Sequence, residues 1–199
     1  MVSLRNIIAR LWPAKIRTQL ICGVALVHLL LMSFFIFDLV GRQRDFLGQQ
    51  SLEQTTSLAE TLAINSGSWV LANDAVGLEE IVLAVGKYPG LRYAMVINTN
   101  GQVLAHTDKS HLGQQLVDEK SRALLSAKPQ SRTLHVDQNV LDVAAPILTI
   151  SGKIIGWARI AQDQKKIADN LVIISRNGIL YTLTAIVAGS LLAILLGNG

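Results

Sequence analysis

The sequence is poor in the residues that build disulfide frameworks, metal centres and active sites. A single cysteine, Cys22, excludes a disulfide framework within the chain and a cysteine-built zinc site. The four histidines are scattered, and neither a Gly-x-Ser-x-Gly turn nor a His-Glu-x-x-His helix occurs. Asp108 and His111 are close enough in sequence to reach one metal ion, but two ligands on a short loop are weak evidence for a site. We expect no catalytic residue, no metal and no cofactor in this chain.

Charge is also scarce, and its distribution argues against nucleic acid as a partner. Only 16% of the residues are charged, and the net charge is +4. Residues 41–177 carry 14 basic and 13 acidic residues and have no basic stripe. The excess of positive charge comes from four basic residues that precede position 18 without any acidic residue: Arg5, Arg10, Lys15 and Arg17.

Half of the residues are hydrophobic, and two long apolar runs contain many of them. Leu20 to Val40 is a run of 21 residues, and Ile179 to Leu196 is a run of 18 residues without charge. Both are long enough to cross a bilayer. The first run is longer than the apolar core of a signal peptide, so we interpret it as an uncleaved anchor.

The basic N-terminus sets the expected orientation, because Lys and Arg are enriched on the cytoplasmic side of a membrane. We predict a two-span membrane protein with a cytoplasmic N-terminus and a loop outside the cytoplasm, in the periplasm if the cell is Gram-negative. The chain ends soon after the second run, so we expect it to be the front of a longer protein. The predicted parts are 1–17 cytoplasmic, 18–40 first transmembrane helix, 41–177 extracytoplasmic domain, 178–196 second transmembrane helix and 197–199 start of a cytoplasmic part.

The first part of the loop has helical periodicity. Residues 41–70 contain no proline, and one helical face carries a stripe at three- and four-residue spacing. This stripe either packs on the domain's own sheet or forms a seam between two copies of the chain. Asn73 or Asp74 can cap a second helix that ends at Gly86. The stripe consists of Leu52, Thr55, Ala59, Leu62, Ser66 and Trp69.

From Leu91 onward the side-chain pattern changes to a period of two residues, which is typical of strands. The turns at 98–101 and 151–153 contain the Asn and Gly residues that tight hairpins need. We expect a short helical segment after Asp108, a short helix at 119–127 and a last helix at 162–176 that leads into the second apolar run. This order predicts an α+β domain with a five-stranded antiparallel sheet. The expected strands are 91–98, 102–106, 131–136, 140–150 and 154–161.

Two segments of the loop resemble a known family. LRYAMVINTNGQVLAHTDKSHLGQQL at 91–116, followed by LDVAAPILTISGKIIGWARI at 141–160, is similar to single-Cache domains, the PAS-like extracytoplasmic sensors of bacterial receptors. The resemblance covers roughly residues 41–170. It implies ligand sensing for a histidine kinase, diguanylate cyclase or chemoreceptor. With the two apolar runs, we expect a transmembrane receptor of the bacterial inner membrane that forms a homodimer, binds a small-molecule ligand and signals to a cytoplasmic output module.

Within that superfamily, the citrate and C4-dicarboxylate sensor kinases have a Gly-x-Arg-x-x-His strand and a further Arg on the strand that leads into Pro-Ile. Here Val103 stands at the first Arg position, between Gly101 and His106, and Asp142 stands at the second. A carboxylate clamp needs guanidinium donors. The two departures therefore predict a ligand that is neutral, zwitterionic or cationic rather than a multiply charged carboxylate.

Five polar residues are candidates for ligand contact: His106, Asp142, Arg132, Tyr93 and Arg92. His106 ends a strand, where it meets a ligand or hydrogen-bonds the following loop. Asp142 faces the pocket or pairs with Arg132 or Arg92. Tyr93 shares a face with apolar residues, so core packing is the alternative to stacking on a ligand.

Three other polar or aromatic side chains on the predicted strands receive a structural interpretation. Strand alternation places Arg132 and His135 on opposite faces, so at most one of them points inward. Trp157 and Arg159 share a face of the last strand, where a surface cation–π pair accounts for both.

A second function remains open at this point. The chain is either the sensor portion of a receptor or a small two-span envelope protein that uses the PAS-like domain to contact a partner protein. Continuation of the reading frame beyond Gly199 into an output module would favour the first interpretation.

Overall fold

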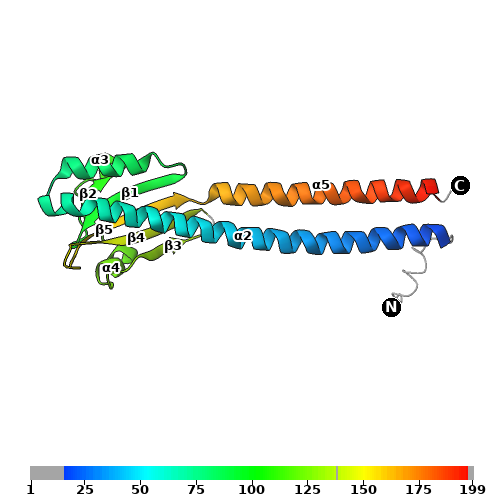
Figure 1. The fold of residues 1–199 in the computed structure, drawn as a ribbon, viewed down its shortest axis with the longest axis horizontal. Coiled ribbons are helices and arrows are strands. Elements are labelled where there is room, and N and C mark those ends of the chain that lie inside the picture. Colours follow the sequence, from blue (N-terminus) through cyan, green and yellow to red (C-terminus); the bar gives the residue numbers. More distant parts are fainter. Residues whose placement is uncertain (1–15, 138, 197–199) are drawn as a thin grey trace. The chain divides into compact units, whose positions relative to one another are not determined.

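The computed structural model describes residues 16–137 and 139–196, which form two units (Figure 1). The first unit contains the described residues of 1–45 and 170–199, and the second contains those of 46–169. Residues 1–15 and 197–199, which belong to the predicted cytoplasmic parts, lie outside the described residues. The elements are α2 Ile16–Ala72, α3 Ala75–Gly86, β1 Leu91–Asn98, β2 Val103–His106, η1 Lys109–His111, α4 Glu119–Leu125, β3 Arg132–Val136, β4 Val140–Leu148, β5 Ile154–Asp163 and α5 Lys165–Leu196.

Two of the described helices are long and apolar enough to cross a membrane. Their apolar windows lie in Cys22–Ala72 of α2 and Leu171–Gly189 of α5. α2 continues without a break from its apolar part into the second unit, as the absence of helix breakers after the first run suggested.

The second unit is built on one five-stranded antiparallel sheet with the order β2-β1-β5-β4-β3. This confirms the predicted fold class. The last helix begins at Lys165 and not at Gln162, because Gln162 and Asp163 continue the ladder of β5 opposite Leu141 and Val140 of β4. Similarly, α4 ends at Leu125, two residues before the predicted end.

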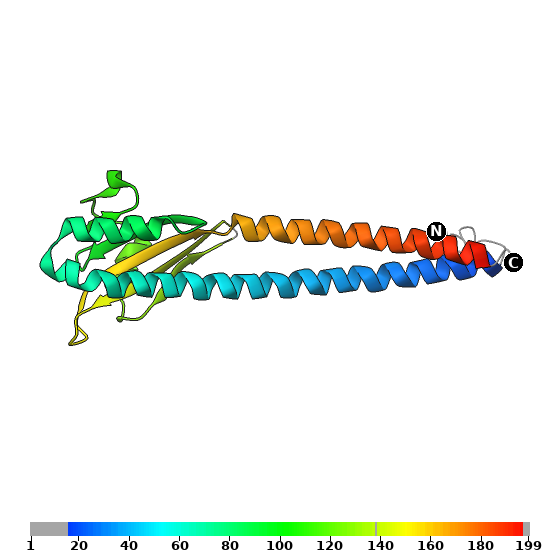
Figure 2. The same cartoon turned by 45° about the horizontal axis from the view of Figure 1, so that its top comes forward.

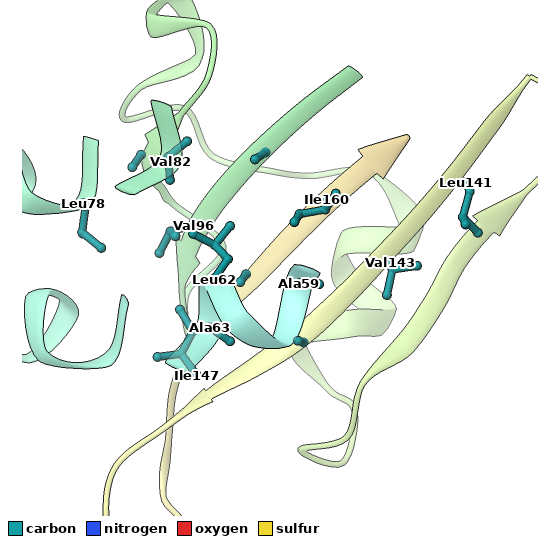
Figure 3. Packing of buried hydrophobic residues seen from close by; sticks show 14 residues of the cluster. Ala59, Leu62, Ala63, Leu78, Val82, Val96, Leu141, Val143, Ile147 and Ile160 are labelled. Atoms are coloured by element: carbon teal, nitrogen blue, oxygen red, sulfur yellow. The ribbon is translucent and has the colours of Figure 1, made fainter. Parts of the chain in front are cut away.

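One face of the sheet is covered by α2 and α3, and both views show α2 running across the strands (Figures 1 and 2). Figure 3 shows the packed core on this face, in which Ala59, Leu62 and Ala63 of α2 meet side chains such as Val143 and Ile160. The central members of the helical stripe are thus buried against the chain's own sheet, which excludes them as a seam between copies. Leu52 and Trp69, at the ends of the stripe, are more than a third exposed.

The corner between α2 and α3 has a specific cause. Asn73 adopts a positive φ of 54°, and the Asp74 side chain accepts hydrogen bonds from the backbone N–H groups of Val76 and Gly77, both at 3.0 Å. Asp74 is therefore the cap, and the carboxylate satisfies amides that the first turn of a helix leaves unpaired. Gly77 leaves room for Trp69, because a Cβ there would lie 2.4 Å from the indole ring.

The opposite face of the sheet packs against α4 and neighbouring segments. Its apolar part includes Met95, Ile97, Val103, Leu124 and Trp157. Unlike the face under α2, this one also buries charged and polar side chains near the centre of the sheet. A buried polar group is costly unless it is hydrogen-bonded, so these side chains are the natural place to look for function.

Candidate functional site

An ion pair between two neighbouring strands forms the centre of the polar cluster. The Arg159 Nε of β5 donates to both carboxylate oxygens of Asp142 on β4, at 2.9 and 3.1 Å, and Nη2 donates to Oδ2 at 2.5 Å. Both side chains are buried. Burial alone would lower the pKa of Arg159, but the hydrogen bonds to Asp142, together with the electrostatic effects of Tyr93, Asp142 and Asp118, outweigh it and raise the pKa above its usual value.

Tyr93 of β1 completes the centre of the site. Its hydroxyl donates to Asp142 Oδ2 at 2.9 Å, and the Arg159 guanidinium carbon lies 5.8 Å from the centre of its ring. Burial and the neighbouring Asp142 carboxylate raise the pKa of Tyr93 well above its usual range. The phenol therefore stays protonated and serves as a fixed donor to Asp142.

α4 supplies the remaining partner of the guanidinium. Arg159 Nη1 donates to Ser121 Oγ at 3.0 Å, and the Ser121 hydroxyl donates to Asp118 Oδ2 at 2.6 Å. Partial burial raises the pKa of Asp118, but hydrogen bonds from the Ser121 hydroxyl and amide overcome this and lower it. A continuous polar chain thus runs from Asp118 through Arg159 and Asp142 to Tyr93.

His106, at the end of β2, is buried beside this chain and stacks on Tyr93, with ring centres 5.6 Å apart. The backbone N–H of Asp108 donates to His106 Nδ1 at 2.8 Å. An amide N–H can only donate, so this shorter contact assigns the neutral ring the tautomer with its proton on Nε2. The Asp108 carbonyl oxygen, 3.0 Å from the same Nδ1, would accept from the other tautomer. Burial, and next the nearby His111, lower the pKa of His106.

The two remaining candidates, Arg92 and Arg132, form no hydrogen bond with Asp142 or Arg159 in the described part of the chain, and neither does the nearby His135. Arg92 is exposed on β1. Arg132 Nη2 donates to the Lys128 carbonyl at 3.4 Å, while its Nε is buried without a hydrogen-bond partner among the described residues. His135 Nε2 lies 3.0 Å from Asp137 Oδ2 and is half exposed.

The prediction that Arg132 and His135 lie on opposite faces of the sheet is wrong. The register of β3 shifts between Thr133 and His135, so Arg132 stands opposite Ala144 and His135 stands opposite Asp142. Directly opposed residues share a face of a sheet. A β-bulge has therefore brought both side chains to the face that carries the ion pair.

Two further expectations are corrected here. Trp157 and Arg159 do share a face, but they are 1% and 7% exposed and do not form a surface pair. The partner of Asp142 is Arg159 and not Arg132 or Arg92. The sequence interpretation missed Arg159 as a member of the site because it placed this residue on the surface. It missed Ser121 and Asp118 because they reach Arg159 from a separate helix.

The described residues also show a depression on the exposed side of α4, lined by Glu119, Arg122, Ala123 and Ser126. It does not include the side chains of the buried polar chain, which lie under the opposite side of α4. We therefore place the candidate site at the buried cluster.

Comparison with known proteins now identifies the family. A family model described as single cache domain 3 matches residues 42–176. The chain belongs to the single cache domain 3 family. Cache domains are sensor modules that bind extracellular ligands. A comparison with curated proteins finds no match.

A solved sensor-domain structure, that of E. coli DcuS, shares the fold of this Cache domain. The E. coli DcuS sensor domain is 20% identical with a TM-score of 0.51, and the match covers 64% of this chain and 96% of that one. The sensor domain of the V. cholerae histidine kinase DctB is 14% identical with a TM-score of 0.49, covering 73% and 59%. The V. cholerae LuxQ periplasmic domain is 14% identical with a TM-score of 0.43, covering 73% and 70%.

Proposed function

We propose that this chain is the transmembrane sensor portion of a bacterial signalling receptor, whose periplasmic Cache domain binds a small ligand. The supporting observation is that the Cache domain, matched at 42–176, is joined at both ends to helices apolar and long enough to cross a membrane. In this proposal residues 18–40 and 178–196 span the inner membrane, and residues 1–17 are cytoplasmic.

The proposed ligand site is the sheet face that carries Tyr93, His106, Asp142 and Arg159. The carboxylate of Asp142 neutralises the buried guanidinium, and Ser121 takes a further N–H group. A guanidinium with these internal partners has little left to offer an external carboxylate. The proposed ligand is accordingly neutral, zwitterionic or cationic, and His106 Nε2 is the donor that it would meet.

Transmission requires that ligand binding change the position of an element that leads to the membrane. β5 carries Arg159, and α5 begins two residues after β5 ends. The Lys165 N–H donates to the Asp163 side chain at 2.8 Å, which fixes the start of α5 to the end of the strand. A shift of β5 at the ligand site would therefore be passed along the chain into α5.

The end of β5 is also bound to α2 by buried polar side chains. Gln164 Nε2 donates to Ser51 Oγ at 2.8 Å, and the Thr55 hydroxyl hydrogen-bonds to Gln162 Oε1. Ser51, Thr55 and Gln164 are all buried. These contacts couple the strand to the other helix that leads to the membrane, so a ligand that binds two arrangements of β5 unequally would shift both helices.

The proposed receptor acts as a homodimer and signals to a cytoplasmic output module. The dimer contact cannot use Ala59 or Leu62, because both are buried against the sheet of their own domain. It must use another surface of the chain.

The function is tested by a binding screen of the full chain in lipid nanodiscs. We expect an amine, an amino acid or a neutral solute to raise the unfolding temperature and to slow amide exchange in β5 and at Lys165, because a ligand that binds only the folded state stabilises it. Citrate and succinate should release no heat. Arg92→Met should retain binding, whereas Arg159→Met should lose it; micromolar binding of citrate or succinate would contradict the proposed ligand class.

A further inference from the structure

Two imidazole rings lie stacked between the sheet and η1. The ring centres of His106 and His111 are 4.5 Å apart, with 27° between the ring planes. His106 belongs to β2 and is buried, whereas the side chain of His111 in η1 is 47% exposed. The stack is therefore a contact between the sheet and a surface segment whose outer member is open to solvent.

The neutral form of His106 holds the loop backbone. Its Nδ1 accepts the Asp108 N–H at 2.8 Å, and the Asp108 carbonyl oxygen lies 3.0 Å from the same nitrogen. A proton on Nδ1 would bring two N–H groups together, so the amide contact would have to break. The Asp108 carbonyl oxygen, already 3.0 Å from Nδ1, would then be the acceptor. Protonation of His106 thus costs the Asp108 amide its acceptor and brings two N–H groups together at this contact.

Two charged side chains lie near His111 on the loop side. The Asp108 carboxylate lies 3.6 Å from His111 Nδ1, and the Ser110 amide lowers the pKa of Asp108, so the carboxylate is ionised. Lys109 adds a positive charge to η1, but it is paired with Glu79 of α3.

On the sheet side, the acidic residue of the cluster is already paired, so it does not provide a counter-ion for a protonated His106. Tyr93 of β1 stacks on the ring and donates its hydroxyl to Asp142 of β4. The Asp142 carboxylate is itself neutralised by Arg159 of β5. A proton on His106 would therefore enter a buried position beside a protonated His111. Burial and His111 lower the pKa of His106, which agrees with this geometry.

We propose that the His106–His111 stack is a proton-responsive latch, which holds η1 on the sheet when His106 is neutral and releases it when both rings are protonated. Two imidazolium rings at this separation repel each other, and the Asp108 amide loses its acceptor. The chain beyond η1 is held independently, because Gly113 N donates to the Val103 carbonyl and Val103 N donates to the Gln114 carbonyl, both at 2.9 Å. Movement is confined to residues 108–112.

The latch makes acidity an input to the sensor. His106 is also the proposed ligand donor, so release of η1 at low pH would alter the ligand site. This consequence rests on the proposed function, whereas the latch itself can be measured without any ligand.

The latch is tested on the full chain in nanodiscs with isotope-labelled histidine, by following the ring resonances from about pH 8 to about pH 4. Amide exchange of residues 108–112 is measured over the same range and corrected for the intrinsic effect of pH. The test variant is His111→Gln, whose exposed position should not disturb folding. The matched control is His135→Gln, since His135 also lies beside an aspartate but on β3.

In the wild type we expect exchange at 108–112 to rise by roughly tenfold or more as His106 is protonated. In His111→Gln the midpoint of His106 should move upward, because the neighbouring positive charge is gone. His135→Gln should change neither quantity. An unchanged His106 midpoint in His111→Gln, or full protection of 108–112 while His106 titrates, would overturn the latch whatever the ligand screen shows.

Discussion

Asp142 and Arg159 form a buried ion pair although neither residue stands opposite the other in the sheet. The register pairs Asp142 with Ala161 and Arg159 with Ala144, so the two charged residues are diagonal neighbours on β4 and β5. The small alanine side chains leave room for the guanidinium to lie along the sheet and meet the carboxylate at 2.9 Å. This relationship determines the electrostatics of the whole site.

Removal of the carboxylate should destabilise the domain strongly. Asp142→Ala leaves a buried guanidinium without its counter-charge, and breaking a buried pair in this way costs about 3–5 kcal/mol. The free energy of unfolding, measured by denaturant titration of the 46–169 unit within the full chain, should fall by this amount.

The matched comparison is a double replacement. Asp142→Leu combined with Arg159→Met removes both charges and should restore most of the loss, because apolar side chains replace a buried ion pair at little cost. Arg92→Met, on the exposed part of β1, should have almost no effect. If the double variant were as unstable as Asp142→Ala, the pair would not be the cause of the loss.

The stability of the domain should decline as the pH falls below neutral, and His106 should account for part of the decline. Its pKa in the folded state lies below the ordinary value of 6.5, so the unfolded chain binds the proton more readily. The stabilising contribution is fully present above about pH 6.5 and is lost as the pH falls toward the folded-state pKa of His106. His106→Gln should flatten the pH dependence of unfolding in this window. A curve of unchanged slope for this variant would rule out His106 as its source.

The contact between β5 and α2 should be sensitive to loss of one amide. Gln164→Leu leaves the buried Ser51 hydroxyl without its donor, and an unsatisfied buried polar group costs about 1–3 kcal/mol. Gln50→Leu, at an exposed position of α2, serves as the control. In the proposed receptor, Gln164→Leu should also weaken the response of α5 to ligand, read as amide exchange at Lys165. Equal stability of the two variants would show that this contact does not hold β5 to α2.

The proposed topology predicts opposite results for two reporter fusions. A reporter that is active only outside the cytoplasm should work at Gln130, an exposed position between α4 and β3, and should fail at the N-terminus. The reason is the cluster of basic residues before the first apolar run. The reverse pattern of activity would place the Cache domain in the cytoplasm.

Local patterns in the sequence were sufficient for most of the fold. Alternation of apolar residues marked the strands, and the Asn-Gly and Ser-Gly turns marked the hairpins, where Gly101 and Gly152 adopt positive φ. The side chain of Asp74 capped the second helix as its position allowed. These features depend on neighbours within a few positions along the chain, so they can be inferred without a tertiary structure.

The candidate site depended on the register between strands. Folding β4 and β5 about the turn at 151–153 brings Asp142 within reach of Arg159, but the strand pattern alone did not show which face would be buried under α4. The bulge in β3 also placed His135 on the same face as Arg132, although strand alternation predicted opposite faces. Ser121 reached Arg159 from a separate helix, 38 positions away along the chain.

The sequence by itself determined the two apolar runs, the α+β class and the family, because composition, periodicity and local motifs carry that information. Only the tertiary structure decided that the helical stripe packs on its own sheet and that Arg159 is the partner of Asp142. It also placed His106 against His111. Such long-range contacts depend on which strands pair, in which register, and on which element covers each face.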